Sequence, residues 1–250
     1  MPAARVPIPR QVEPLLRAIG QLADQRGMRA YAVGGCVRDW LLGLTDTPDL
    51  DVTVEGDGIA IARAAGRILN GTLTVHQQFG TATRRLRRGR GGHPAGSLRV
   101  DFATCRRETY ARSAAYPRVA AGTLEDDLFR RDFTINAMAA ALSPIRFGAL
   151  VDPFQGARDL RRRRLRILHA RSFLDDPSRL LRGIRFAQRF GLRWEPATRR
   201  AAREAVAAGA LGWLNAGRLR RELDRMREEP DPLACVGELA ALLDSSTDTA

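Results

Sequence analysis

Hydrophobic and polar positions in the first 150 residues recur with spacings that predict both helices and strands. Apolar residues stand at helical spacing from Val12 to Ala23, so residues 10–27 are expected to form an amphipathic helix. Further helices are expected around Trp40, ending at Gly43, and over residues 58–69. Short apolar or alternating runs predict strands at residues 30–33, 50–55, 72–76, 81–86 and 97–104. This mixture predicts an α/β or α+β domain up to about residue 144.

From residue 155 onward the pattern is mainly helical. Helices are expected over residues 176–190, 196–207, 216–229 and 232–243. The glycine- and arginine-rich residues 87–96 are expected to form a mobile hairpin tip. The expected organisation is an N-terminal helix, a head of mixed strands and helices, a helical region and a disordered tail, at residues 1–28, 29–150, 151–243 and 244–250.

Length and cysteine content restrict the class of protein. With 250 residues, the chain can bury a core as one large domain or two smaller ones. No apolar run approaches the roughly 20 residues that a membrane span needs, and no secretory signal is visible in residues 1–11. Three widely spaced cysteines fit neither a disulfide framework nor a zinc site, so reduced thiols and a cytoplasmic location are expected.

Positive charge dominates the composition and is concentrated in the second half. The net charge is +13, and all 41 basic residues are arginine, a bias that a GC-rich genome also explains. Residues 158–229 hold 20 arginines against 9 acidic residues, a net charge of +11. This distribution indicates a polyanionic partner, above all nucleic acid, bound by the second half. The run of arginines at 161–164 suits RNA phosphates or a solvated helix end.

Paired aspartates are the first candidates for chemistry. Asp49 and Asp51 stand two positions apart at the start of an expected strand, so both side chains lie on one face. Mg²⁺ prefers such carboxylate oxygens, and phosphoryl transfer requires a divalent metal. The alternative is a turn aspartate after Pro48 followed by a solvent-facing strand residue, because such triplets are common by chance. Asp101 lies between Val100 and Phe102, an unfavourable core position unless it faces metal or substrate.

A glycine turn lies just before the paired aspartates. Gly34 and Gly35 join an expected strand to an expected helix, where backbone amides can approach a phosphate. Arg38, one helical turn further, can reach the same group. The alternative is an ordinary tight turn with a surface arginine.

Four ordered blocks resemble class II tRNA nucleotidyltransferases and bacterial poly(A) polymerases, a family of the polymerase β superfamily. The first block is GGCVRD at residues 34–39, followed by DLD at residues 49–51. The others are RRDFTINA at residues 130–137, VDPF at residues 151–154 and DDPSRLLRGIRF at residues 175–186. The resemblance covers roughly residues 30–230. It implies an α+β fold, with a mixed-sheet polymerase β-like head followed by an all-helical neck.

The resemblance also implies roles for individual residues. Asp49 and Asp51 would bind Mg²⁺, and Asp101 would be the third catalytic acid, best placed to activate an RNA 3′ hydroxyl. The nucleotide would be contacted by residues of the first two blocks, namely Gly34, Gly35, Arg38, Arg130, Arg131, Asp132 and Asn136. In the fourth block, Asp176 and Arg179 would read the base, supported by Arg182 and Arg185. Residue 175 is aspartate where many members have glutamate.

The pattern within the fourth block agrees with a base-reading helix. Its apolar and polar residues separate onto two sides, with Asp176, Arg179, Arg182, Arg185 and Arg189 on the polar side. A carboxylate accepts from an exocyclic amine and a guanidinium donates to a ring acceptor, the pair of groups that cytosine and adenine offer together. The alternative is a solvated basic face, for which Phe186 and Phe190 would be unusual neighbours.

Several products remain open within the family. The expected activity is addition of C and/or A to the tRNA 3′ end from CTP and ATP; CC-only addition and poly(A) synthesis are alternatives. The full length of residues 107–125 favours CCA or A addition, because in the family a shortened loop there is associated with CC-only addition. A catalytically silent RNA-binding paralogue is the non-enzyme alternative. Typical members continue into tRNA-clamping regions, so a minimal form, a fragment or a protein partner that supplies these regions is expected.

Overall fold

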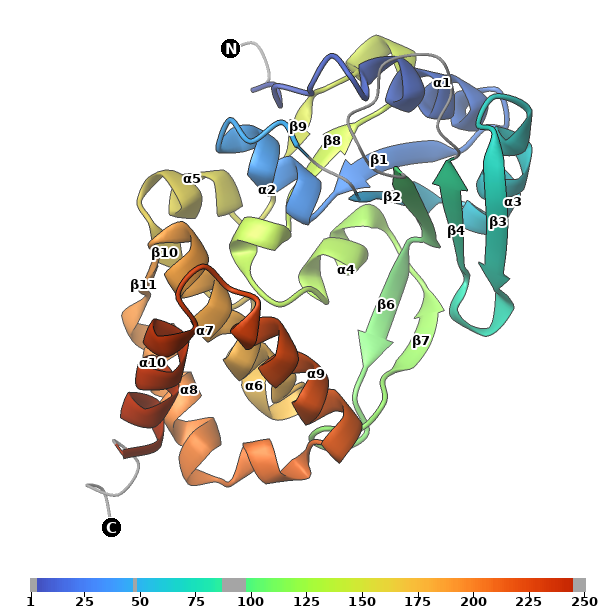
Figure 1. The fold of residues 1–250 in the computed structure, drawn as a ribbon. Coiled ribbons are helices and arrows are strands. Elements are labelled where there is room, and N and C mark those ends of the chain that lie inside the picture. The colour runs from blue at the N-terminus through green and yellow to red at the C-terminus, as the bar shows by residue number, and fades with distance from the viewer. Residues whose placement is uncertain (1–3, 47–48, 87–97, 245–250) are drawn as a thin grey trace. The chain divides into compact units, whose positions relative to one another are not determined.

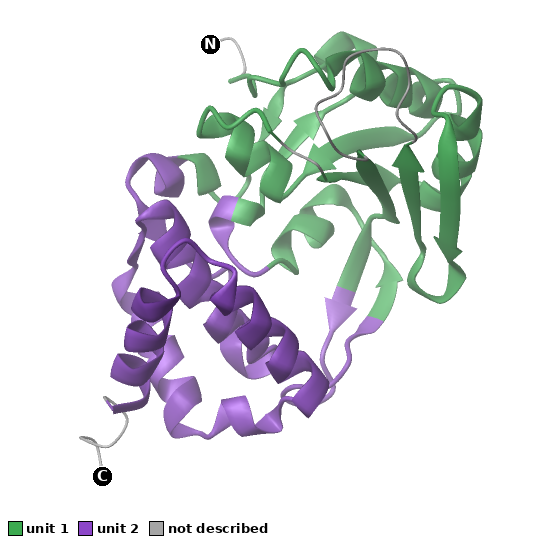
Figure 2. Cartoon of the chain, viewed as in Figure 1, with its two compact units in different colours: residues 1–107, 119–131, 136–157 green, residues 108–118, 132–135, 158–250 purple. Residues whose placement is uncertain are grey.

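The computed structural model describes residues 4–46, 49–86 and 98–244, and they divide into two compact units (Figures 1 and 2). The first unit comprises residues 1–107, 119–131 and 136–157, and the second comprises residues 108–118, 132–135 and 158–250. The expected hairpin tip at 87–96 and residues 245–250 of the expected tail lie outside the described residues. In the described part of the chain, no helix is both long and apolar enough to cross a membrane.

The first unit is built on a mixed sheet of seven strands, in the order β3-β4-β5-β2-β1-β8-β9. The strands are β1 (Arg29–Val33), β2 (Asp49–Glu55), β3 (Gly71–His76), β4 (Thr81–Leu86), β5 (Arg99–Thr104), β8 (Ala139–Ala141) and β9 (Leu150–Val151). β2 and β5 are parallel neighbours, whereas the other neighbouring strands pair antiparallel. The prediction of an α+β fold with a mixed sheet is confirmed.

Helices complete the first unit. They are α1 (Glu13–Asp24), α2 (Gly35–Leu41), α3 (Gly58–Ala64) and α4 (Leu124–Phe129). Helix α1 packs on β1, α3 packs on β4 and β5, and the two helices contact each other, so they cover one face of the sheet. The expected helix at 58–69 is shorter than predicted, because residues 65–67 tighten into a 3₁₀ turn after α3. Helix α4 begins with a reciprocal capping box, in which Thr123 and Asp126 bond each other's backbone amides.

The remaining short elements follow in chain order. They are β6 (Arg106–Thr109), β7 (Arg118–Ala121), α5 (Gly156–Arg161), β10 (Arg164–Leu165) and β11 (Arg193–Trp194). β6 and β7 form a two-stranded sheet, and β10 and β11 form another, which is parallel.

The second unit is predominantly helical, as expected. Its helices are α6 (Ser172–Asp175), α7 (Ser178–Phe190), α8 (Pro196–Ala207), α9 (Ala216–Arg227) and α10 (Pro232–Asp244). Helix α7 packs against α6, α9 and α10. The core of the second unit contains Phe133. Its ring centroid lies 6.3 Å from that of Phe173 and 6.0 Å from that of Phe186. Phe186 therefore belongs to the core, which explains its presence among the arginines of this helix.

The helix expected over residues 176–190 begins later than predicted. Asp176 has an extended backbone, with φ −139° and ψ 93°, and Pro177 follows it. A residue before proline is disfavoured in the helical conformation, because the proline ring clashes with its backbone. Asp176 thus lies in the connection between α6 and α7, and its predicted place on the polar side of the helix is wrong. The predicted end at Phe190 agrees with the structure, where Gly191 caps the helix with φ 58°.

Candidate active site

An open cavity of about 390 Å³ lies at the β2–β5 pair of the first unit. Its lining combines two of the expected catalytic aspartates with both arginines of the second sequence block. The carboxylates and guanidiniums of the lining belong to Asp51, Asp101, Arg99, Arg106, Arg130 and Arg131. Opposite charges therefore meet in one cavity, an arrangement that suits a phosphorylated ligand bound together with a cation.

Strand alternation places the aspartates on one face of the sheet. On β2, Leu50 and Val52 are buried, whereas Asp49 and Asp51 are exposed. In the parallel pairing of β2 with β5, Asp51 stands directly opposite Asp101. Two carboxylates that are 50 positions apart in the sequence thus become neighbours. Asp49 lies at the beginning of the same strand, opposite Arg99 of β5.

The carboxylate of Asp101 is held in place by its neighbours. Thr83 on β4 donates its hydroxyl proton to Asp101 Oδ1 over 2.5 Å. Arg99, two residues earlier on β5, contacts both oxygens, with Nε 3.1 Å from Oδ1 and Nη2 2.5 Å from Oδ2. Neither Arg99 nor Thr83 belongs to a recognised sequence block, although the two-residue spacing on one strand face indicates contact between Arg99 and Asp101.

The surroundings of Asp51 disfavour its negative charge. The pKa of Asp51 is raised from its ordinary value, first because surrounding protein removes water from the carboxyl group, and further because Asp101 and Asp49 are negative. The guanidinium of Arg131 acts in the opposite direction. Asp51 is nonetheless exposed on its cavity side. A cation bound here would relieve the repulsion between these carboxylates.

The donor set fits a hard divalent cation that is bound only partly by protein. Among the residues that the structure describes, no group of three or more His, Cys, Asp or Glu side chains is arranged to hold a metal. Asp49 and Asp51 offer two carboxylates on one strand face, whereas Asp101 is already bonded to Arg99 and Thr83. Mg²⁺ is commonly held by one or two carboxylates, with water and substrate phosphates completing its octahedron. The residues present fit that mode.

The glycine turn after β1 admits a guanidinium. Gly34 has φ +77°, in the left-handed region that favours glycine. A Cβ atom at Gly34 would lie 2.5 Å from Nη1 of Arg131, which no folded chain tolerates without a shift. The amide of Gly34 donates to the carbonyl of Met138 over 3.1 Å. Gly34 thus contributes by admitting Arg131, while its own amide is engaged in the sheet.

Arg38 and Asn136, both expected to contact the nucleotide, lie together in the first unit. Arg38 donates Nη1–H to Asn136 Oδ1 over 2.6 Å, and Nε–H to Asp39 Oδ1 over 2.9 Å. Only 7% of the Arg38 side chain is exposed. Its guanidinium is therefore held from two sides, which contradicts the alternative of a surface arginine.

Arg130 and Arg131 share one carboxylate, that of Asp127, which lies outside the sequence blocks. Asp127 accepts at Oδ1 from Nε and Nη2 of Arg130, at 3.0 and 2.8 Å. At Oδ2 it accepts from Nη2 of Arg131 over 3.1 Å. The spacing of three and four residues at the end of α4 is the sequence signal that predicts such pairs.

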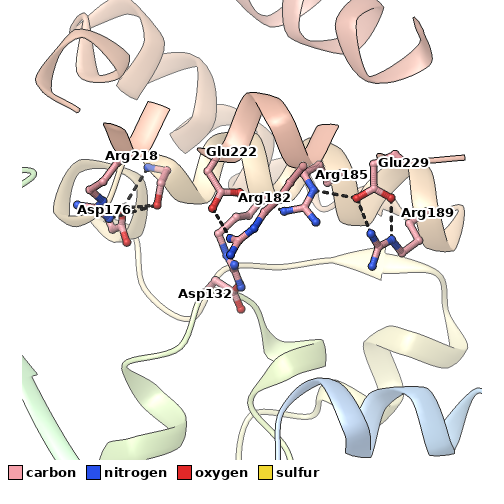
Figure 3. A network of polar contacts seen from close by, with 10 residues as sticks. Asp132, Asp176, Arg182, Arg185, Arg189, Arg218, Glu222 and Glu229 are labelled. Atoms are coloured by element: carbon pink, nitrogen blue, oxygen red, sulfur yellow. Dashed lines mark hydrogen bonds and ion pairs between the residues drawn. The ribbon is translucent and has the colours of Figure 1, made fainter. Parts of the chain in front are cut away.

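The second unit holds the expected base-reading residues. Asp176 accepts at Oδ1 from the amide and hydroxyl of Ser178, at 3.1 and 2.6 Å, and from Nη2 of Arg218 on α9 at 2.7 Å (Figure 3). A cavity of about 180 Å³ is lined here by Asp176, Ser178, Arg182, Arg218, Arg221 and Glu222. The role of Arg218 was missed, because it stands 42 residues away in another expected helix.

The arginine face of α7 is largely internal. Arg182 donates Nε–H to Asp132 Oδ2 over 2.9 Å, which joins two residues of the expected site. Arg185 donates to Glu222 and Glu229 at 3.1 and 2.8 Å, so these ion pairs connect α7 to α9 and the residues that follow it (Figure 3). Arg179 is buried and donates to Ser172 Oγ over 2.7 Å. The alternative of a solvated basic face is therefore wrong for Arg179 and Arg185.

Comparison with known proteins gives consistent matches. Residues 30–166 match the family model described as the poly A polymerase head domain. An A-adding tRNA nucleotidyltransferase of Halalkalibacterium halodurans is 40% identical over 230 residues, which are 91% of this chain and 52% of that protein. A CCA-adding enzyme solved in an apo form has a TM-score of 0.87 and 42% identity, covering 97% of this chain and 57% of that one. A CCA-adding enzyme solved with ATP has a TM-score of 0.80 and 41% identity, covering 93% and 51%.

The matches extend over nearly the whole chain but over only part of the relatives. The chain spans about half the length of the Halalkalibacterium protein. The matched part includes the sequence blocks at residues 34–51, 130–137 and 151–154 and the helical region with α7.

Proposed function

Because the chain belongs to the family of the poly A polymerase head domain, we propose that it transfers a nucleoside monophosphate from ATP or CTP to the 3′ end of tRNA and releases pyrophosphate. The observation that carries the proposal is the pairing of Asp51 with Asp101 on adjacent parallel strands, in one cavity with Arg130 and Arg131. The match to an A-adding enzyme makes ATP the first nucleotide to test.

The carboxylates divide the chemistry between them. Asp49 and Asp51 would hold Mg²⁺, which when bound neutralises triphosphate charge and lowers the pKa of the attacking hydroxyl. Asp101 would face the RNA 3′ hydroxyl and accept its proton. Thr83 and Arg99 fix the orientation of that carboxylate, which favours a single direction of attack.

Arginines of the same unit would bind the triphosphate. Arg130 and Arg131 line the cavity, and guanidiniums in fixed positions donate to phosphate oxygens in pairs. Gly34 would contribute through the space it leaves for Arg131, and Gly35 as the first residue of α2. Arg38 and Asn136 would form a bonded pair that touches the nucleotide at the same turn.

Base selection would belong to the second unit. Asp176 takes its described hydrogen bonds at Oδ1, which leaves Oδ2 able to accept from the exocyclic amine of adenine or cytosine. Arg179 would donate to the adjacent ring acceptor. Arg182, bonded to Asp132, would support this pair. Arg185 would stabilise the helical unit through its ion pairs to Glu222 and Glu229 without touching the nucleotide.

Binding of the tRNA would use the positive charge of residues 158–229. The arginines at 161–164 are exposed, as phosphate contacts require. Since this chain spans about half the length of the Halalkalibacterium relative, further tRNA contacts would come from a continuation of the chain or from a partner protein. A cytoplasmic location stays a prediction, to which the three free, buried thiols contribute.

Incubation with tRNA transcripts that lack A, CA or CCA, with labelled ATP or CTP and Mg²⁺, tests the function and the product. We expect incorporation of A on the acceptor that ends in CC. Incorporation of both nucleotides identifies CCA addition, C alone identifies CC addition, and a long ladder with ATP identifies poly(A) synthesis. Absence of incorporation on every acceptor would refute the enzyme and leave the RNA-binding paralogue.

A further inference from the structure

Asp127 on α4 is a buried carboxylate for which the proposed chemistry has no direct use. Its side chain is 0% exposed, and it accepts hydrogen bonds from Arg130 and Arg131 on separate oxygens. We propose that Asp127 is a positioning residue, which holds both guanidiniums in the orientation that receives the phosphates of the nucleotide. This inference rests on the proposed function, because it concerns how the same cavity binds its nucleotide.

The geometry shows why two adjacent arginines need such a partner. Arg130 and Arg131 are consecutive, yet both line one cavity, so their like charges would drive the guanidiniums apart. Asp127 receives Arg130 in a fork at Oδ1 and Arg131 at Oδ2, and it neutralises one of the two positive charges. The cluster retains a net charge of +1 toward the cavity.

Burial and charge indicate that Asp127 acts through the arginines. A carboxylate without contact to water is unstable in the protein interior unless its charge is fully paired. Burial alone would raise the pKa of Asp127, but Arg131 and Arg130 outweigh this, so its pKa lies below the ordinary value and it stays charged at neutral pH. The arginine side chains keep 18% and 16% exposure, so they can still contact a ligand.

Arg131 connects Asp127 to the cavity at the β2–β5 pair. Its Nη1 atom lies so close to Gly34 that a Cβ atom there would be 2.5 Å away. Arg131 and Asp51 line the same cavity. A guanidinium in this place lies beside the glycine turn and lines the cavity of Asp51, where a triphosphate would extend.

The test is the substitution Asp127→Asn, which keeps the shape and removes the charge. We expect the KM for ATP and the Kd for a non-hydrolysable ATP analogue to rise about tenfold, as the loss of two preordered side chains implies. The turnover number should change much less, and the KM for tRNA should stay constant. Asp127→Glu should recover part of the loss, because it restores the charge.

Asp126 offers a matched control on the same helix. Its side chain bonds only to Thr123 among the described contacts, as part of the capping box. Asp126→Asn should lower the melting temperature while leaving the KM for ATP unchanged. An equal rise of KM in both variants would show that only helix stability matters, and would overturn the positioning role.

A double-mutant cycle shows whether Asp127 acts through Arg131. In the Arg131→Gln background, Asp127→Asn should weaken ATP binding by clearly less than it does alone. Full additivity would overturn the proposal. If the unaltered protein binds the analogue but incorporates nothing, the proposed function fails while the binding cycle still tests Asp127. If it does not bind the analogue, both fail.

Discussion

Arg185 connects α7 to Glu222 on α9 and to Glu229, which follows the C-terminal end of α9. The resemblance implied a nucleotide-binding role for this residue, whereas its contacts indicate a structural one. Its side chain is 9% exposed, and it contacts Glu222 at 3.1 Å and Glu229 at 2.8 Å. The substitution Arg185→Met keeps much of the side-chain volume but removes the charge, so the two glutamates lose a shared partner.

The magnitude follows from what remains around the glutamates. Removal of one partner from a buried ion pair costs about 3–5 kcal/mol, since the other charge is left in the interior. Glu229 keeps Arg189 at 2.7 Å, and Glu222 keeps Arg225 at 2.8 Å. Because each glutamate retains one arginine, we expect about 3 kcal/mol of lost unfolding free energy, at the lower end of that range.

Urea unfolding at pH 7, followed by far-UV circular dichroism and by tryptophan fluorescence, measures this loss. Two of the three tryptophans, Trp194 and Trp213, belong to the helical unit, so the fluorescence change reports on that unit. Arg189→Met is the matched control. Its side chain is 38% exposed and pairs only with Glu229 among the described ion pairs, so we expect about 1 kcal/mol or less.

The KM for ATP separates the two roles of Arg185. At 25 °C the variant should remain folded and bind ATP with unchanged KM. A loss of less than about 1 kcal/mol in unfolding free energy, combined with a raised KM for ATP, would refute the structural assignment and support direct nucleotide contact.

Four further predictions concern catalysis, packing, pH and salt. Asp51→Asn should abolish nucleotide incorporation while RNA binding in filter assays stays near that of the unaltered protein; surviving activity would disprove the metal assignment. Gly183→Ala would place Cβ 2.6 Å from the Trp194 ring, and should cost about 1–3 kcal/mol in thermal unfolding. The pKa of His169 is lowered, mainly by burial and then by the charge of Arg179. Below the ordinary pKa, His169 therefore binds a proton more readily in the unfolded chain than in the folded one. Unfolding free energy should therefore fall as pH drops below about 6.5, and less so in His169→Asn. Raising salt from about 50 to 200 mM should weaken RNA binding by about 10³-fold if roughly six phosphates are contacted, and salt-independent binding would contradict the basic surface.

The sequence by itself determined the local elements and the family. Alternation around Asp49 and Asp51 predicted β2 and the shared face of the two carboxylates, because side chains of a strand alternate with a period of two. The strand at 81–86 and the end of α7 at Phe190 also agree with the structure. Ordered motifs identified the family, which the matched residues 30–166 support. All of these properties depend on residues close together in the chain.

Only the tertiary structure decided which distant side chains meet. Asp51 lies opposite Asp101 because β5 pairs parallel with β2, a choice of strand order that no local pattern contains. Arg182 and Arg185 of α7 are internal because they pair with acidic residues that lie 37 to 50 positions away in the sequence. These residues are Asp132, Glu222 and Glu229. Local periodicity reveals that a helix has two faces, but burial of a face depends on what packs against it. For the same reason, the pairing of Asp176 with Arg218 became visible only in the folded chain.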